Sequence, residues 1–278
     1  MEKGMTGGKR RKAKELYQEL DAFFQPAQYE DLAANGLLAD HTEWIEKVYT
    51  ATFSGRQVIE KLREAEAENC LLFTHHPGAQ HPEGLPAENF SDEDRAFMQK
   101  KGISHYSLHL PLDQVSPYST GISLARALGI FPYHSFFEEG GAVMGLYCST
   151  EWKTSADVRL ETEKLMGHDC RLYAYSEERL QDGKIALIAG GAEIGAEGTE
   201  IYPKLREAGI RLLLTGVGNP KIDWFAPSHE AARQAGVSIL AAGHYSTEQF
   251  ALQAMCRFFL ERGVDAVFLS EAPHLTDL

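Results

Sequence analysis

Cysteine is scarce in this sequence and scattered where it occurs. The four cysteines among 278 residues are Cys70, Cys148, Cys170 and Cys256, and no two of them stand in a C-x-x-C pair. Neither a disulfide framework nor a thiolate zinc site is therefore indicated. Positive charge is also scarce, with 27 Lys and Arg against 40 Asp and Glu and a net charge of −13. This balance argues against general nucleic-acid binding and against attraction to anionic lipids, because both need cationic residues.

Long apolar runs are missing as well. No stretch approaches the length needed to span a membrane, and residues 1–12 lack the hydrophobic core of a secretion signal, so a cytoplasmic location is expected. The hydrophobic fraction of 44% and the charged fraction of 24% are typical of a globular protein. At this length the chain can form one large domain or two of ordinary size, with a substantial core.

Strand-like and helix-like patterns alternate along the chain. An amphipathic helix pattern at 56–67 separates strand patterns at 47–53 and 69–74, which predicts a β-α-β unit with parallel strands. The second half repeats this plan. Its expected helices cover 155–166 and 228–235, and its expected strands cover 145–150, 170–175, 184–189, 211–216 and 237–242. The alternation predicts an α/β protein with parallel or mixed sheets.

The most informative stretch is Asn69-Cys-Leu-Leu-Phe-Thr-His-His-Pro77. Its apolar run predicts a strand that is buried on both faces, and a proline cannot continue a central strand. His75 and His76 should therefore lie at the carboxyl end of a strand, where open α/β sheets place ligand sites. The strand must break there if both imidazoles serve one site, because successive side chains of a regular strand point to opposite faces. One core histidine and one surface histidine would explain this stretch equally well.

A second candidate region covers residues 103–113, Ile-Ser-His-Tyr-Ser-Leu-His-Leu-Pro-Leu-Asp. Its alternation predicts a strand that ends near Pro111 and carries His105 and His109 on one face. Asp113 would follow at the strand end, where a buried carboxylate needs a cation or hydrogen-bond donors. The two histidines are candidates for acid or base catalysis.

Two further features receive a structural interpretation. The stretch Gly190-Gly-Ala-Glu-Ile-Gly195 follows a predicted strand but lacks the second glycine of G-x-G-x-x-G and the lysine of a P-loop. It therefore predicts a tight strand-to-helix turn rather than a phosphate-binding loop. His81 lies on the loop after the histidine pair and is expected to be a loop residue rather than a ligand.

The stretch Gly243-His-Tyr-Ser-Thr-Glu248 again places a histidine directly after a buried strand. His244 and Glu248 are four residues apart, so they share a face if the following helix begins early. If the helix instead begins at Ser246, which can form a capping box with Gln249, the histidine lies on the turn. Both arrangements let the two side chains bind one ion. The alternative without a metal is a carboxylate that caps the helix beside a turn histidine.

Five residues of metal-ligand type thus follow buried strands, namely His75, His76, Asp113, His244 and Glu248. Three imidazoles and two carboxylates suit zinc, manganese or iron better than calcium or magnesium. Five ligands exceed the needs of one open tetrahedral site, and a carboxylate can bridge two ions, so a dinuclear centre is predicted. Two ions about 4 Å apart can activate water as a nucleophile. No nucleophile elbow or reactive cysteine competes with this interpretation.

These motifs resemble the NGG-one-interacting factor three family (Nif-three-like, DUF thirty-four), whose members are often described as GTP cyclohydrolase 1 type 2 homologues. The resemblance runs from about Ala13 to Ser270 and depends on His-His-Pro, H-x-x-L-D and G-H-Y-x-T-E. It implies two related α/β halves, 1–134 and 135–278, with a dinuclear metal site in the cleft between them, and the last helix can pack back on the first half. It also implies ring-like hexamers, and it carries over the same five ligands.

The chain departs from the family pattern at positions near the ligands. The usual H-T-N-x-D appears as His109-Leu-Pro-Leu-Asp113, and Val217 replaces an acidic residue. Such changes affect the contacts around a metal and the choice of substrate. The resemblance implies a metal-dependent hydrolase of a nucleotide or a related small molecule. The alternative is a metal-binding or regulatory protein without catalysis.

Overall fold

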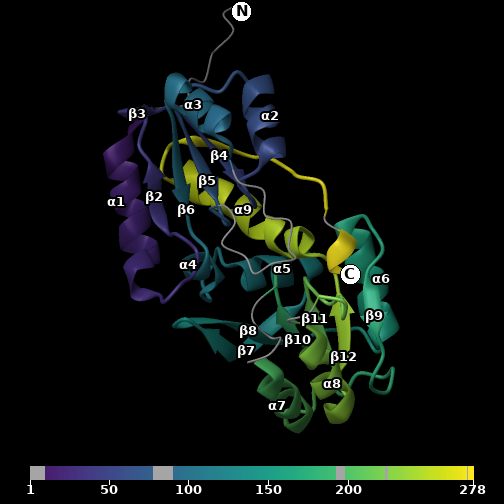
Figure 1. Ribbon diagram of the computed structural model, residues 1–278. Helices are drawn as coiled ribbons and strands as arrows, with labels where there is room; N and C mark the ends of the chain where they lie inside the picture. The colour runs from purple at the N-terminus through teal and green to yellow at the C-terminus, as the bar shows by residue number, and fades with distance from the viewer. Residues whose placement is uncertain (1–9, 78–89, 192–197, 223–224, 274) are drawn as a thin grey trace, which may run out of the picture. The chain divides into compact units, whose positions relative to one another are not determined.

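The protein divides into two compact units. The computed structural model describes residues 10–77, 90–191, 198–222, 225–273 and 275–278 (Figure 1). The first unit comprises Met1–Leu112 and Leu252–Glu271, and the second comprises Asp113–Ala251 and Ala272–Leu278. Each unit is built on one main β-sheet.

The sheet of the first unit has five strands in the order β13-β4-β5-β6-β2. The first four run parallel to one another, and the edge strand β2 is antiparallel to β6. The bounds are β13 Asp265–Phe268, β4 Lys47–Ala51, β5 Cys70–Thr74, β6 Ile103–Ser107 and β2 Gly36–Ala39. A separate short ladder pairs β1, Arg11–Lys12, with β3, Trp44–Ile45.

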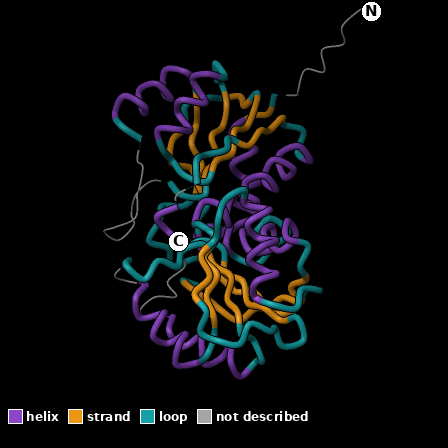
Figure 2. Tube along the Cα trace, turned by 90° about the vertical axis from the view of Figure 1, so that its right-hand side faces the viewer, coloured by secondary structure: helices purple, strands orange, loops and turns teal. Residues whose placement is uncertain are grey.

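Helices cover both faces of this sheet, as Figure 2 shows. On one face, α2 (Arg56–Glu64) and α3 (Asp92–Lys101) pack on a core that includes Leu72. On the other face lie α1 (Ala13–Phe24) and the last part of α9 (His244–Glu261), where the ring of Phe73 lies 5.6 Å from that of Phe259. The neighbouring residues Leu72 and Phe73 point to opposite faces, so β5 is buried on both sides, as its apolar run predicts.

The sheet of the second unit has six strands in the order β7-β8-β10-β11-β12-β9. The three central strands β10, β11 and β12 are parallel, and the outer strands are antiparallel to their neighbours. The bounds are β7 Phe131–Glu139, β8 Ala142–Ser149, β10 Lys184–Ile188, β11 Leu212–Thr215, β12 Ser238–Ala241 and β9 Arg171–Tyr173.

Helices cover both faces of the second sheet as well. One core joins α5 (Thr120–Leu128) and α6 (Ser155–Met166) to Leu187, Leu214 and Leu240. The other joins α7 (Ile201–Glu207) and α8 (Ala226–Ala235) to Leu213, Ile188 and Ile239. The alternation along each strand therefore separates two apolar cores.

The sequence predicted most of these elements. The mixed α/β class and the parallel pairing of β4 with β5 are confirmed. Among the described residues, the elements that had not been predicted include β1, β3, α4 (Leu110–Asp113), β7, α7 and β13. The expected domain boundary at 134/135 lies inside the second unit, because α5 packs on the second sheet. Among the described residues, no helix is long and apolar enough to cross a membrane.

The predicted strand over 103–111 is wrong beyond Ser107. After β6 the chain bends, and Leu110–Asp113 forms the single helical turn α4. The turn is held by a hydrogen bond of 2.8 Å from the Leu112 amide to the His109 carbonyl. A proline is compatible with the first turn of a helix, where its missing N–H costs nothing. His109 therefore does not lie on the strand with His105.

The central strands should carry most of the stability of the second unit. Leu213 is fully buried in β11, and we expect Leu213→Ala to lower the free energy of unfolding by about 2–5 kcal/mol, because a cavity replaces the side chain. Leu160 on α6 is 51% exposed, so Leu160→Ala should change it by less than about 0.5 kcal/mol. Urea denaturation followed by circular dichroism measures both. Equal effects would contradict this packing.

Candidate metal centre

The strand β5 ends directly before the histidine pair. The amides of His75 and His76 donate to the carbonyls of Ala51 (3.3 Å) and Thr52 (2.8 Å), so the backbone stays beside β4 after Thr74. Both side chains are buried, with 0% and 2% of their surface exposed. The alternative of one core and one surface histidine is therefore wrong.

The two rings are held in different ways. His75 Nδ1 donates to the carbonyl of Leu108 at 2.8 Å, which assigns metal-ligand capacity to Nε2. The His76 ring stacks on the ring of Phe53, with ring centroids 4.6 Å apart. The backbone carbonyl of His76 accepts a hydrogen bond of 2.6 Å from Ser54 Oγ. Both imidazoles are thus oriented by contacts within the first unit.

A third histidine joins this pair. His109 follows β6 on the bend, and its ring centroid lies 5.2 Å from that of His75 and 5.0 Å from that of His76. The three residues each offer a ligand atom within 4.8 Å of the others. Three imidazoles in such an arrangement are able to hold a metal ion of the zinc or iron type.

A loop before β2 holds His109 in place by hydrogen bonds. Its Nδ1 lies 2.9 Å from Asp31 Oδ1, and its amide donates to Asn35 Oδ1 at 2.7 Å. Burial raises the pKa of Asp31, but the hydrogen bond and charge of His109, together with bonds from Asn35 and Ala33, hold that pKa well below its usual range. Sequence patterns alone do not single out Asp31, nor do they indicate that Asn35 contacts His109. The Asx-turn spacing Asp-x-Ala before Asn-Gly was an available signal.

His105 lies elsewhere in the first unit. It is buried on the α2 and α3 side of the sheet, where its ring packs against Phe90 and its Nε2 lies 2.8 Å from Thr74 Oγ1. Burial lowers the pKa of His105 to about 3, so the ring is neutral near neutral pH. It has the environment of a hydrogen-bonding core residue.

The second unit holds the other candidate ligands. Helix α9 begins at His244, so His244 and Glu248 share one face, and Nε2 lies 3.0 Å from Oε1. The helix therefore begins early rather than at Ser246. The His244 amide donates to Asp277 Oδ2 at 3.1 Å. A carboxylate at this position is favoured by the first turn of a helix.

Asp113 completes the set in this unit. Its Oδ1 accepts a hydrogen bond of 2.6 Å from Thr120 Oγ1 at the start of α5. The carboxylates of Asp113 and Glu248 offer ligand atoms within 4.8 Å of each other, and both residues are buried, with 8% and 3% exposed. Two buried carboxylates at such a separation repel each other unless a cation or donors compensate.

The turn after β10 leaves room for the side chains of Glu248 and His244. Gly190 has φ +73°, and a Cβ built there would lie 1.9 Å from Glu248 Oε1 and 3.3 Å from His244 Nε2. The turn at Gly190–Gly191 is observed, and the position of the Glu248 side chain requires a glycine at 190. Residues 192–197 of the same stretch, and His81, lie outside the described residues.

Comparison with known proteins gives consistent matches over most of the chain. The family model described as Duf34/NIF3 (NGG1p interacting factor 3) matches residues 11–273. A protein of Archaeoglobus fulgidus named GTP cyclohydrolase 1 type 2 homolog is 27% identical over 264 residues, covering 92% of this chain and 96% of the relative. A protein of the same name from Pyrococcus horikoshii is 26% identical over 263 residues, with the same coverage of each chain.

Solved structures match the fold. The protein ybgI, described as of unknown function, superimposes with a TM-score of 0.77 at 21% identity, covering 95% of this chain and 100% of the other. TTHA1606 from Thermus thermophilus gives a TM-score of 0.72 at 25% identity, with the same coverage.

The glycine at position 190 provides a test of the local geometry. We expect Gly190→Ala to destabilise the second unit by about 1–3 kcal/mol more than Gly167→Ala, because the new methyl group overlaps Glu248. Gly167 is the matched control, with φ +75° and nothing within 4 Å of an added Cβ. Urea denaturation measures both, and the excess should disappear in a Glu248→Ala background. Equal costs at the two glycines would contradict the contact.

Proposed function

The chain belongs to the Duf34/NIF3 family, and on that premise we propose that it is a metal-dependent hydrolase of a nucleotide or a related small molecule, with a dinuclear centre. The observation that carries this proposal is the burial of the residues that could bind a metal ion. The first unit buries His75 and His76 beside His109, and the second buries two carboxylates beside His244. Such donors are buried at a cost that a bound cation offsets.

The proposal assigns both donor sets to one centre. Chain connectivity supports this, because Asp113 follows directly on Leu112, the last residue of the first segment of the first unit. Glu248 precedes by four residues Leu252, where α9 enters the first unit. The centre would then use the five ligands His75, His76, Asp113, His244 and Glu248. This nitrogen-rich set suits zinc, iron or manganese.

Bound divalent ions would lower the pKa of a water molecule and orient it for attack. The residues of the chain would supply the proton transfer. We assign that role to His109, because its ring lies beside His75 and His76 and 22% of its side chain is exposed. We assign His105 a supporting hydrogen bond to Thr74, since its pKa of about 3 keeps it neutral. The names of the relatives favour a nucleotide as substrate.

The family resemblance also leads us to propose a homohexamer in the cytoplasm. Sedimentation-velocity centrifugation of the purified chain, whose monomer mass is 30.9 kDa, tests the oligomeric state. A monomer at micromolar concentration would contradict the hexamer and leave the metal assignment standing.

Metal binding is the first prediction of the proposal. His76→Ala, Asp113→Ala and Glu248→Ala should each reduce the metal content of the purified protein, measured by elemental analysis, while circular dichroism stays unchanged. His105→Gln is the matched control, because it alters a buried histidine outside the ligand set and should retain the metal. Full metal content in all three alanine variants would refute the assignment.

Catalysis is a separate prediction. A panel of nucleoside triphosphates, cyclic nucleotides and phosphate esters should include a substrate that is hydrolysed with metal and not after chelation. His109→Gln should lower kcat by about 100- to 10,000-fold at unchanged metal content, as expected for loss of a general acid or base. Bound metal without turnover across the panel would favour the alternative of a non-catalytic metal-binding or regulatory protein.

A further inference from the structure

We propose that Asp31 is a positioning residue, which holds the His109 ring with its proton on Nδ1 and presents Nε2 to the centre. This inference rests on the proposed function, because it concerns the residue to which proton transfer is assigned. It is carried by hydrogen bonds within the first unit and needs no metal for its test.

The carboxylate of Asp31 is fully used. Oδ1 lies 2.9 Å from His109 Nδ1 and accepts from the Ala33 amide at 2.9 Å. Oδ2 accepts from the Leu110 amide and from Asn35 Nδ2, each at 2.8 Å. An ionised carboxylate has about four lone-pair positions and no proton to give. Since the other three partners are donors, His109 Nδ1 must be the fourth donor.

The position of the proton decides what the other nitrogen can do. A neutral imidazole carries one proton, so a ring with its proton on Nδ1 has a lone pair on Nε2. Among the described residues, His109 Nε2 has no hydrogen-bond partner, whereas Nδ1 and the backbone amide are both held. The bond to Asp31 therefore selects Nε2 as the nitrogen that meets water, substrate or metal. Carboxylates commonly orient histidines at metal sites in this way.

A purely local role for Asp31 would explain only half of its contacts. The bonds from Ala33 and Asn35 close the loop on itself, over two and four residues. The bonds from His109 and Leu110 join it to a segment 78 and 79 residues away. Asn35 adds a third long-range contact by accepting from the His109 amide. The loop therefore fixes the position of His109 by hydrogen bonds to the ring and to the backbone amide of that residue.

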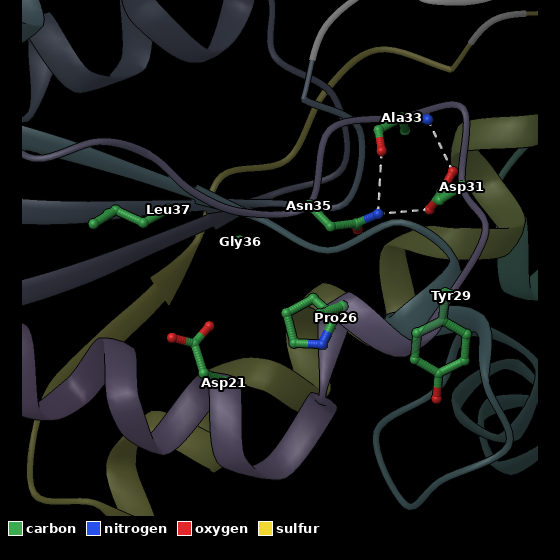
Figure 3. Close-up of a pocket in the computed structure, with 9 residues that line it drawn as sticks. Asp21, Pro26, Tyr29, Asp31, Ala33, Asn35, Gly36 and Leu37 are labelled. Carbon is green, nitrogen blue, oxygen red and sulfur yellow. Dashed lines mark hydrogen bonds between the residues drawn. The ribbon is translucent and has the colours of Figure 1, made fainter.

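The same loop lines a cavity of about 430 Å³, drawn in Figure 3. Asp31 and Asn35 lie along one part of its wall, and Asp21 on α1 lies along another. Asp21 accepts a hydrogen bond of 2.6 Å from Tyr106, a residue of β6 that lies outside the loop's hydrogen bonds to His109. It thus provides a control of the same chemical type, in the same cavity and with a buried partner of its own.

The test is the tautomer of His109, measured by nitrogen NMR on the full chain labelled with ¹⁵N-histidine. His109→Gln identifies the signals. Spectra are recorded at alkaline pH after treatment of the protein with a chelator. We expect a protonated Nδ1 and an unprotonated Nε2 in the chelator-treated protein. Because neither metal nor turnover enters this measurement, its result is distinct from failure of the proposed function.

Two variants complete the test. Asp31→Asn has nearly the same shape, but its NH2 group faces two of the four donors and its remaining oxygen is an uncharged, weaker acceptor. The His109 signals should therefore shift towards the other tautomer or to a mixture. Asp21→Asn should leave them unchanged. A proton on Nε2 in the unmodified protein, which requires no variant to fold, would overturn the proposal. Unchanged His109 signals in folded Asp31→Asn would also overturn it.

Turnover offers a second readout where a substrate is hydrolysed. Asp31→Asn should then lower kcat by about 10- to 100-fold, the range found for residues that orient metal-site histidines, with little change in KM. The effect should vanish in a His109→Gln background, since Asp31 acts through His109. An equal further loss in the double variant would show a merely structural role and would contradict the proposal.

Discussion

The close approach of buried carboxylates is the constraint on which the second unit depends. Glu248 lies 3.0 Å from His244 and within 4.8 Å of Asp113, and all three side chains are nearly excluded from solvent. Charges of one sign repel strongly where water does not screen them. Several segments that are distant in the sequence accommodate these buried carboxylates. Helix α9 begins at His244, and position 190 is glycine because a Cβ there would overlap Glu248. Thr120 donates to Asp113 from the start of α5.

The first unit meets a milder form of the same problem. Its candidate donors are imidazoles, which are neutral when unprotonated and cost less to bury than carboxylates. The contacts of these imidazoles serve instead to orient the rings. His75 is held by the carbonyl of Leu108, His76 by the ring of Phe53, and His109 by Asp31. The three contacts come from three different loops, and rigid support of this kind is what functional groups need to act in one geometry.

The sequence predicted the parts of the structure that depend on local patterns. The apolar run before His75 predicted β5, and the spacing of His244 and Glu248 predicted a shared face, although not where α9 begins. Helix α6 was placed by its periodicity over 155–166. What escaped prediction depends on distant partners. The strand through His109 ends early because Asp31 and Asn35 hold the bend. The sequence around Gly190 predicts only an ordinary turn, because the need for glycine there comes from its contact with the distant Glu248.

The division of donors between the units has a physical consequence for the proposed centre. The candidate ligands of the first unit are all imidazoles, whereas both carboxylates, together with the imidazole of His244, belong to the second unit. The electrostatic need for a cation therefore lies with Asp113 and Glu248. Binding of a cation by the folded protein shifts the folding equilibrium towards the folded state. That stabilisation should therefore act mainly through the second unit. In the proposed centre, the oriented imidazoles of the first unit would complete the coordination. In the proposed centre, the histidine pair after β5 would thus supply oriented ligands, while the buried carboxylates would supply the electrostatic driving force for metal binding.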